Sequence, residues 1–418
     1  MADTEVPLIP RGSLKRSREN RKMNYRKRLL LVVALIALTL LGVGVYIVKT
    51  SPEFNQYALV RQYGAVPESE SELKSPRTIL LWNGFFGDKR WSLPEDTLGP
   101  AYFRDDLHCP VYHCELTNVR HFLPEVEMFD AILFHTAEPF PLLNSVPQRR
   151  RERQLYVFAL MEPPGETKHV LDDESGFYNL TMSYRLDSDI IWPYQYILDK
   201  STDTIVAPKF YPDWRQPPTT WNDTELWTLL EGKTKLVAWF VSHCETLSKR
   251  EQLAHELGKF INVDIYGKCG TKSCPRDSEA CDQILDNDYK FYLSFENALC
   301  TDYISEKFFN ALKRQIVPIV FGGANYTRFA PPHSYIDAES FADVEELAAY
   351  LKYLDTHPAE YMRYFWWRKY YRLGYRSPFC DLCEKLHSAT VRQKTQIYQN
   401  IEKWWIGSSC RFKANIEW

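Results

Sequence analysis

Apolar runs and helical patterns alternate along the second half of the chain. The runs at 236–241, 263–266, 289–295 and 316–321 predict buried strands, and helical spacing of apolar residues predicts helices at 248–260, 303–314 and 344–354. Strands that alternate with helices in this way indicate a parallel α/β unit. In the first half, the apolar runs at 78–82, 129–134 and 155–161 predict further strands. The pattern therefore predicts an α/β fold.

The longest apolar segment lies near the amino end. Residues 29–48 are twenty residues without a charged side chain, which is long enough for a helix to span a bilayer. Nine Lys or Arg residues lie between Arg11 and Arg28, directly before this segment, whereas Lys49 alone follows it closely. Positive flanks stay on the cytosolic side, so the amino end is predicted to be cytosolic. A cleaved signal peptide has a shorter apolar core, so we interpret the segment as a permanent signal anchor.

Charge is distributed unequally along the chain. The first 49 of its 418 residues hold ten basic and three acidic residues, a net charge of +7, whereas the whole chain has a net charge of −3. The remaining residues therefore carry a net charge of −10. A negative balance disfavours nucleic acid as a partner of a catalytic part, so we interpret the basic arm as a topology signal.

The chain divides into a membrane-attached amino end and a larger remainder. We predict a basic cytosolic tail at 1–28, a transmembrane signal anchor at 29–48 and a polar stem at 49–76. The remainder is too long for one average domain and suits two. We predict Rossmann-like domains at 77–225 and 226–383, and a C-terminal extension at 384–418.

Cysteines and glycosylation sequons both suit an oxidising lumen. The chain has ten cysteines, and sequons begin at Asn179, Asn222 and Asn325. Cys380 and Cys383 form a CxxC, for which a structural set of disulfide partners is preferred over a zinc site. Two close pairs are candidates for local staples, although spacing leaves the connectivity open: Cys109 with Cys114, and Cys269 with Cys274.

The stretch from 291 to 323 joins an apolar strand, a polar turn and an amphipathic helix. Ile304, Phe308 and Leu312 recur at helical spacing and can face a core, which leaves Glu306 and Lys307 on another face. A helix N-terminus offers unpaired N–H groups and the positive end of a dipole, and a nearby lysine adds a mobile charge. The stretch therefore predicts an anion site suited to a nucleoside diphosphate.

The same stretch carries a family resemblance. FENALCTDYISEKFFNAL followed by PIVFGG resembles the donor-binding signature of the α1,3/4-fucosyltransferases, glycosyltransferase family 10. FALMEPPG, NLTMSYRLDSDIIWPY, KLVAWFVSHC and VDIYGKCG follow in that family's order, and the runs FINVDIYGKCG and ILDNDYKFYLSFEN are most similar to its invertebrate and plant branch. The resemblance implies the GT-B architecture, in which an acceptor-side domain and a GDP-fucose-binding domain face a cleft.

Glu162 is the candidate general base. It ends an apolar strand and is followed by two prolines, which stiffen its backbone at the edge where open α/β sheets hold their chemistry. Position alone equally fits a hydrogen-bonded carboxylate at a strand end. The resemblance implies that Glu162 takes the proton of an acceptor hydroxyl as the bond to fucose forms. One base and direct displacement would invert the anomeric centre.

Two cations are candidates to neutralise the diphosphate leaving group. Arg250 lies on the helix after the strand at 236–241, and Lys307 lies on the helix after the strand at 289–295, so both can approach one crevice. Taken singly, Arg250 could pair with Glu245 or Glu251 on a solvated helix face. Lys307 could form a surface pair with Asp302 or Glu306. The resemblance implies that both contact the donor pyrophosphate.

The resemblance implies three further donor-binding residues: Asn297, Tyr303 and Glu306. Glu296 either faces the donor or satisfies buried backbone, and we leave it outside the site. Leu247 and His243 stand where relatives often carry Arg and Asn, so altered donor use or low activity remains open.

Asp187 and Asp189 form a DxD pattern, which binds manganese in other glycosyltransferases. Here it lies within MSYRLDSDI, which resembles a fucosyltransferase segment whose aspartates organise structure or the acceptor side. We therefore predict no metal site and no required cofactor, with stimulation by Mn²⁺ or Mg²⁺ left open.

Together these features predict a type II Golgi membrane enzyme with a lumenal catalytic part. The implied reaction moves L-fucose from GDP-β-L-fucose to a hydroxyl, O3, of N-acetylglucosamine in a glycoprotein glycan. The N-glycan core and Lewis-type antennae are competing acceptors. The alternatives are a metal-dependent glycosyltransferase that uses another sugar nucleotide and a catalytically silent relative.

Overall fold

The described part of the molecule is its larger, carboxy-terminal unit. The computed structural model describes residues 76–418 apart from 138–146, 148, 152, 167–175, 222, 276–277, 394–396, 408 and 418. All described residues belong to one compact unit, 67–418. The predicted tail, the predicted signal anchor and nearly all of the stem lie outside the described residues. Among the residues that are described, no helix is long and apolar enough to cross a membrane.

The first sheet has seven strands in the order β2-β3-β1-β4-β5-β6-β7. They are β1 (Arg77–Leu81), β2 (Thr97–Leu98), β3 (Cys114–Thr117), β4 (Ala131–His135), β5 (Leu155–Leu160), β6 (Leu180–Ser183) and β7 (Ile190–Ile191). All pairings are parallel except that of β2 with β3 at one edge. β4 and β5 are buried at every position, as expected for parallel strands covered on both faces. The three strands predicted in this half are confirmed as β1, β4 and β5.

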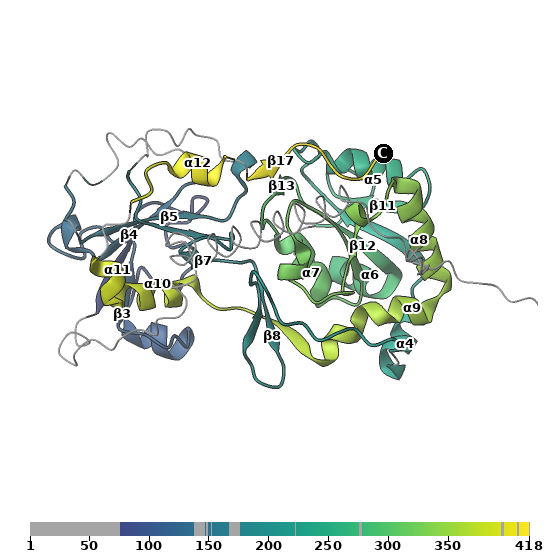
Figure 1. Cartoon of the computed structure of the whole chain (residues 1–418), viewed down its shortest axis with the longest axis horizontal. Coiled ribbons are helices and arrows are strands. Elements are labelled where there is room, and N and C mark those ends of the chain that lie inside the picture. The colour runs from purple at the N-terminus through teal and green to yellow at the C-terminus, as the bar shows by residue number, and fades with distance from the viewer. Residues whose placement is uncertain are drawn as a thin grey trace, which may run out of the picture. The chain divides into compact units, whose positions relative to one another are not determined.

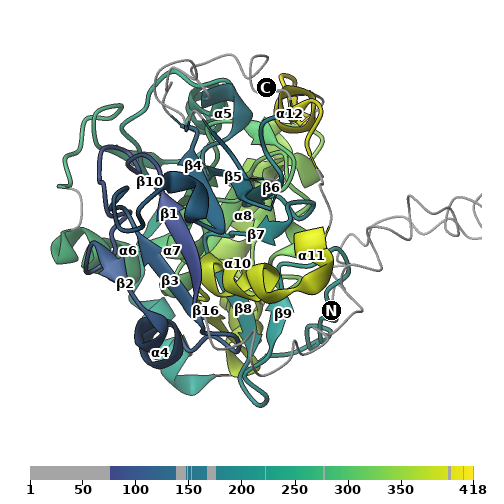
Figure 2. The same ribbon diagram turned by 90° about the vertical axis from the view of Figure 1, so that its left-hand side faces the viewer.

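Elements from the far end of the chain cover both faces of the first sheet (Figures 1 and 2). These are α10 (Pro378–His387), α11 (Ala389–Gln393) and α12 (Ile401–Trp405). Val157 packs on one face in a cluster with Leu382 of α10. The next residue, Phe158, points to the other face, where its ring lies 5.2 Å from that of Trp405. The predicted domain division at residue 383 thus falls inside a helix that completes the core of the first sheet.

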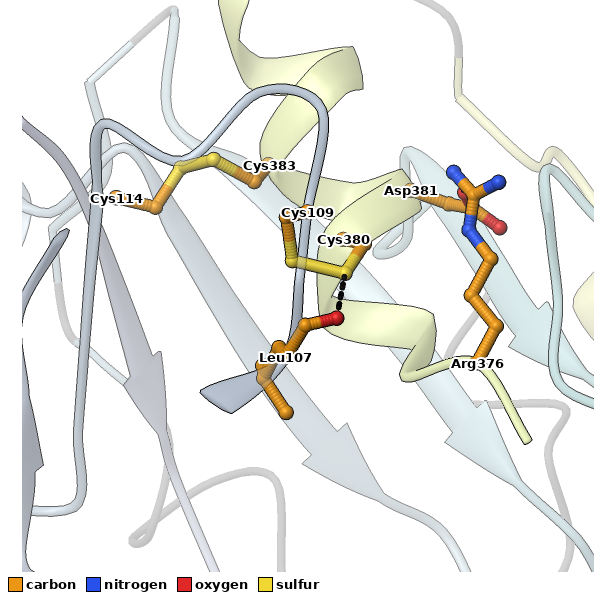
Figure 3. The surroundings of a disulfide bond; sticks show 7 residues. All are labelled: Leu107, Cys109, Cys114, Arg376, Cys380, Asp381 and Cys383. Carbon is orange, nitrogen blue, oxygen red and sulfur yellow. Dashed lines mark hydrogen bonds and ion pairs between the residues drawn. A yellow bond between two sulfur atoms is a disulfide. The ribbon is translucent and has the colours of Figure 1, made fainter. Parts of the chain in front are cut away.

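Two disulfides fasten α10 beside the first sheet (Figure 3). Cys109 bonds to Cys380, and Cys114 bonds to Cys383. The two helix cysteines are three residues apart and therefore share one helix face, from which both reach the segment at the start of β3. The expected local pair of Cys109 with Cys114 is wrong, whereas the expectation that the CxxC supplies structural disulfide partners is confirmed.

The remaining cysteines pair as Cys244–Cys269, Cys274–Cys281 and Cys300–Cys410. The expected local pair of Cys269 with Cys274 is therefore also wrong, because each of these cysteines bonds elsewhere. Ligand atoms of Cys114, Cys383 and His387 lie within 4.8 Å of one another, which is a zinc-like arrangement. The two sulfur atoms are bonded to each other, so neither is a thiolate that could hold zinc.

The second sheet has five parallel strands in the order β11-β10-β12-β14-β15. They are β10 (Lys235–Phe240), β11 (Val263–Tyr266), β12 (Tyr289–Phe295), β14 (Val317–Phe321) and β15 (Ile336–Asp337). The accompanying helices are α4 (Thr224–Glu231), α5 (Arg250–Leu257), α6 (Glu279–Asp288), α7 (Glu306–Lys313), α8 (Val344–Thr356) and α9 (Pro358–Met362). All four strands and three helices predicted in this half are present, and the α/β class is confirmed. α7 begins three residues later than predicted because Ser305 caps it and accepts the N–H of Lys307.

The chain crosses between the two sheets through a small antiparallel sheet. Its order is β16-β8-β9, and its strands are β8 (Tyr196–Asp199), β9 (Ile205–Ala207) and β16 (Tyr371–Gly374). β8 carries the chain away from the first sheet, and β16 leads it back to α10. Near the carboxyl end, β17 (Cys410–Arg411) pairs with β13 (Leu299–Cys300), which lies in the loop after β12. The predicted C-terminal extension therefore contacts both halves of the fold.

Candidate functional site

The strand order of the second sheet reverses between β10 and β12. β11 lies outside β10, whereas β12, β14 and β15 extend the sheet in the other direction. Ligands of open parallel sheets bind beyond the carboxyl ends of the strands at such a reversal. The loop at 241–249 leaves β10 there, and the loop at 296–305 leaves β12. Five predicted site residues lie in these loops or directly after them: Arg250, Asn297, Tyr303, Glu306 and Lys307.

Arg250 is built into the edge of the second sheet. It opens α5 and is only 3% exposed. Its Nη1 donates to the carbonyl of Phe295 at 2.7 Å, and its Nη2 donates to the carbonyl of His243 at 3.2 Å. Its Nε is buried and has no hydrogen-bond partner among the described residues. The guanidinium therefore spans the carboxyl ends of β10 and β12 and does not lie on a solvated helix face.

Lys307 brings a second cation to the same edge. Its Nζ lies 2.8 Å from Ser305 Oγ, 3.3 Å from Glu296 Oε2 and 3.2 Å from Glu306 Oε1. Burial opposes the charge, but the carboxylates of Glu296 and Glu306 outweigh it and raise the pKa of Lys307. Lys307 is therefore an ammonium ion at the N-terminus of α7, where the backbone also offers positive partial charge.

Glu296 organises the start of α7. Its side chain is fully buried, and its carboxylate accepts the backbone N–H of Ser305 at 2.8 Å and the Ser305 hydroxyl at 2.7 Å. Of the two interpretations left open, the structure thus supports the one in which Glu296 satisfies buried groups. Sequence reasoning left this residue outside the site, although a glutamate between a buried strand and a helix cap was an available signal.

Tyr303 joins the loop at 296–305 to the first sheet. Its hydroxyl donates to Asn297 Oδ1 at 3.2 Å, and its ring lies 5.1 Å from that of Tyr184, which follows β6. Tyr303 is 1% exposed, and burial raises its pKa well above the usual tyrosine range. The hydroxyl therefore stays protonated and acts as a hydrogen-bond donor.

Asp302 makes a second tie between the same parts. Its Oδ2 accepts the backbone N–H of Leu186, which follows β6, at 3.1 Å. Asp302 has a left-handed backbone with φ of 60°, which costs about 1 kcal/mol for a residue other than glycine. Because this carboxylate is directed toward Leu186, it is not the partner of Lys307.

Glu162 lies two residues beyond the end of β5, and its charge acts on two tyrosines near the site. Burial raises the pKa of Tyr184 and of Tyr303, and the negative charge of Glu162 adds to that rise at both. The backbone after Glu162 also lies against the loop at 241–249, because a methyl group on Gly165 would lie 2.2 Å from Cδ1 of Leu247. The structure therefore brings Glu162 together with the loops that carry Arg250 and Lys307.

The DxD aspartates have structural partners. Asp187 accepts two hydrogen bonds from Arg185, at 2.8 Å and 2.7 Å. Asp189 Oδ2 accepts the backbone N–H of Thr181 at 2.9 Å and the hydroxyl of Tyr398 at 2.9 Å. These contacts tie β6 and β7 to the C-terminal extension, which supports the structural interpretation of the pattern.

The chain matches two models of protein families. "Fucosyltransferase, N-terminal" matches residues 74–195, and "Glycosyltransferase family 10 (fucosyltransferase) C-term" matches residues 230–404. The first match covers the first sheet, and the second covers the second sheet and α10.

Individual proteins are similar as well. Alpha-(1,3)-fucosyltransferase C of Drosophila melanogaster is 57% identical over 384 residues, which cover 91% of this chain and 90% of the relative. Glycoprotein 3-alpha-L-fucosyltransferase A of the same organism is 36% identical, with 84% of this chain and 65% of the relative covered. A crystal structure of an alpha1,3-fucosyltransferase with GDP-fucose aligns at a TM-score of 0.48 and 17% identity, over 80% of this chain and 96% of the other.

Proposed function

Because the chain belongs to the fucosyltransferases of glycosyltransferase family 10, we propose that it transfers L-fucose from GDP-β-L-fucose to O3 of N-acetylglucosamine in a glycoprotein glycan. As a member of this family it is a glycosyltransferase with GDP-fucose as its donor substrate. The names of the two Drosophila relatives, one with "Alpha-(1,3)" and the other with "3-alpha-L", support the choice of O3.

The observation that carries the proposal is the pair of cations at the strand reversal. Arg250 and Lys307 lie beyond β10 and β12, and their charges are close enough that Arg250 counteracts the rise in the pKa of Lys307. GDP leaves with increasing negative charge on its β-phosphate as the bond to fucose breaks. Fixed cations and helix N–H groups in a partly buried site stabilise that charge without needing to reorganise.

Glu162 is proposed as the base on the acceptor side. Its carboxylate takes the proton of the sugar hydroxyl while that oxygen attacks C1 of fucose, and the C1 bond to GDP breaks on the opposite face. A single displacement turns the β-linked donor into an α-linked product. The strand that ends before Glu162 belongs to the first sheet, which fits an acceptor-side role, with the second sheet binding the donor.

The finer architecture and the location follow as parts of this proposal. Two sheets with separate family matches support a GT-B arrangement in which the acceptor half and the donor half face a cleft. The apolar segment at 29–48, the basic arm before it and the five disulfides support a type II Golgi enzyme with a lumenal catalytic part. The N-glycan core and Lewis-type antennae remain competing acceptors.

The test uses a soluble form that begins at Ser51, with GDP-fucose and two acceptors, a core N-glycan and an N-acetyllactosamine. Products are analysed by mass and linkage, with and without EDTA. Fucose on one acceptor in both conditions supports the proposal and selects the acceptor. Activity that EDTA abolishes supports a metal-dependent enzyme, and GDP-fucose binding without transfer supports a catalytically silent relative.

Variants separate the base from the cations. Glu162→Gln should lower transfer by about 100-fold or more, the usual contribution of a positioned base, with GDP affinity unchanged. Lys307→Ala should weaken GDP binding by about tenfold or more, because it removes a charge-assisted phosphate contact. Lys313→Ala, at the exposed far end of the same helix, is the matched control and should change neither. Near-normal transfer by Glu162→Gln would show that the base lies elsewhere.

A further inference from the structure

Tyr194 lies on the segment that carries the chain out of the first sheet. It follows β7 and precedes β8. Its hydroxyl donates to the backbone carbonyl of Met161, the residue before Glu162, at 3.1 Å. Its ring stands nearly perpendicular to that of Tyr303, with 6.4 Å between the ring centres. One side chain therefore contacts both the backbone beside the proposed base and the tyrosine of the donor-side loop.

The two residues after Glu162 cannot fix the backbone through N–H hydrogen bonds. Pro163 and Pro164 follow it, and neither has an N–H group to donate. β5 ends at Leu160, where its pairing with β6 also ends. The hydrogen bond that Met161 accepts from Tyr194 is therefore an anchor beyond the last strand pair. The anchored residue, Met161, directly precedes Glu162, whose carboxylate must face the acceptor hydroxyl in the proposed reaction.

The negative charges of the site act on the hydroxyl of Tyr194. Burial raises its pKa well above the usual tyrosine range, and the charges of Glu162, Glu306 and Glu296 add to the rise. The phenol therefore stays protonated and keeps its donor. Because three carboxylates from both halves act on it, Tyr194 lies where the base and the donor-side loop meet.

We propose that Tyr194 is a positioning residue for the transfer reaction. By holding the Met161 carbonyl and packing against Tyr303, it fixes the direction of the Glu162 carboxylate relative to the bound donor. This inference rests on the proposed role of Glu162. A displacement of about 1 Å of a catalytic group costs roughly 100-fold in rate, so loss of one hydroxyl can reduce turnover while donor binding is retained.

The test compares Tyr194→Phe with Tyr196→Phe. The control is closely matched, because Tyr196 is two residues away and its hydroxyl also donates to a backbone carbonyl, that of Ile191, at 3.3 Å. Tyr194→Phe should lower kcat by about tenfold to 100-fold, with KM for GDP-fucose and affinity for GDP within about twofold of the parent. Tyr196→Phe should leave kcat unchanged. Equal kcat values in the two variants, or loss of GDP binding in Tyr194→Phe, would overturn the proposal.

A double-mutant cycle with Glu162→Gln distinguishes positioning from a general structural effect. If Tyr194 acts through Glu162, then adding Tyr194→Phe to Glu162→Gln should lower the residual transfer by less than about twofold. A full tenfold further loss would refute action through Glu162. If Glu162→Gln alone retains normal transfer, the proposed base fails, and the positioning role of Tyr194 is overturned with it.

Discussion

Replacement of Glu296 by glutamine tests how much its buried carboxylate contributes to stability and to the proposed donor site. The buried carboxylate accepts the N–H and the hydroxyl of Ser305 and lies 3.3 Å from the ammonium of Lys307. Glutamine has nearly the same shape but keeps only one acceptor oxygen, so its amide N–H₂ must face either the ammonium or the serine hydroxyl. Both neighbours were donors to the carboxylate. The side chain at this position is fully buried, so bulk solvent cannot accept a hydrogen bond from the amide.

The magnitude follows from the contacts that glutamine cannot keep. Hydrogen bonds to a charged group contribute about 1.5–3 kcal/mol each, and Glu296→Gln removes one of them together with the ion pair to Lys307. We expect the free energy of unfolding to fall by about 2–3 kcal/mol, because part of the loss is recovered by the remaining Ser305 contact. GDP affinity should fall by about tenfold, or about 1.4 kcal/mol, since Lys307 and the first turn of α7 lose their fixed position.

The assay combines urea unfolding with calorimetric titration of GDP. Glu256→Gln is the control, since it also takes a carboxylate from a lysine, Lys259, but at a partly exposed i,i+3 pair at the end of α5. Such pairs contribute at most about 1 kcal/mol, so the control should be nearly as stable as the parent and should bind GDP equally well. The reasoning is refuted if Glu296→Gln and Glu256→Gln unfold at the same urea concentration.

Two further predictions concern pH and a disulfide. Burial lowers the pKa of His135 to about 4 from 6.5, so its contribution to stability is complete above pH 6.5 and is lost as the pH falls toward 4. Between pH 7 and pH 5 that loss should be about 2 kcal/mol in urea unfolding, and a His135→Gln variant with the same pH dependence would contradict it. Removal of the Cys300–Cys410 disulfide by serine at both positions should weaken GDP binding, because it releases the loop after β12 from β17. Removal of Cys274–Cys281 by the same change should leave GDP affinity intact, and equal losses in both variants would contradict the prediction.

Elements with strong periodicity were predictable, and weakly patterned ones were not. β12 and β14 are nearly continuous apolar runs, and α7 buries one regular stripe, so each could be predicted from local sequence. α6 was missed because its sequence, EACDQILDND, buries only Cys281 and Leu285. β3, with the sequence CELT, was missed because its burial depends on neighbouring strands and not on its own composition.

The two cations of the site were more predictable from the sequence than the buried residues that hold the site in place. Arg250 and Lys307 each follow a predicted strand, so the topology of a parallel sheet brings them to one edge. The role of Glu296 depends on Ser305, nine residues away, and on the depth at which both are buried. Tyr184 approaches Tyr303 from the other sheet, and local patterns carry no information about such a contact.

The disulfide pairing also could not be predicted from local sequence, because it joins cysteines that are far apart in the chain. Cys109 and Cys380 are separated by 271 residues, and their pairing requires the chain to return to the first sheet after completing the second. Proximity in sequence favoured Cys114 as the partner of Cys109, since a short loop costs less entropy to close. The helix geometry of α10 decides otherwise, because Cys380 and Cys383 present two sulfur atoms side by side.

The contacts between the two halves suggest that turnover is more sensitive to substitution than stability is. The proposed base belongs to the first sheet and the two cations to the second, so the distance across which fucose moves is set by the contacts that join them. The contacts that join them include polar and aromatic ones, such as the hydrogen bond from Leu186 to Asp302 and the packing of Tyr184 on Tyr303. Each contributes about 1 kcal/mol to a fold that buries two large cores, whereas a shift of about 1 Å at the reacting atoms costs roughly 100-fold in rate. Substitutions at these contacts should therefore lower kcat before they lower the urea midpoint, and substitutions of core residues in either sheet should do the reverse.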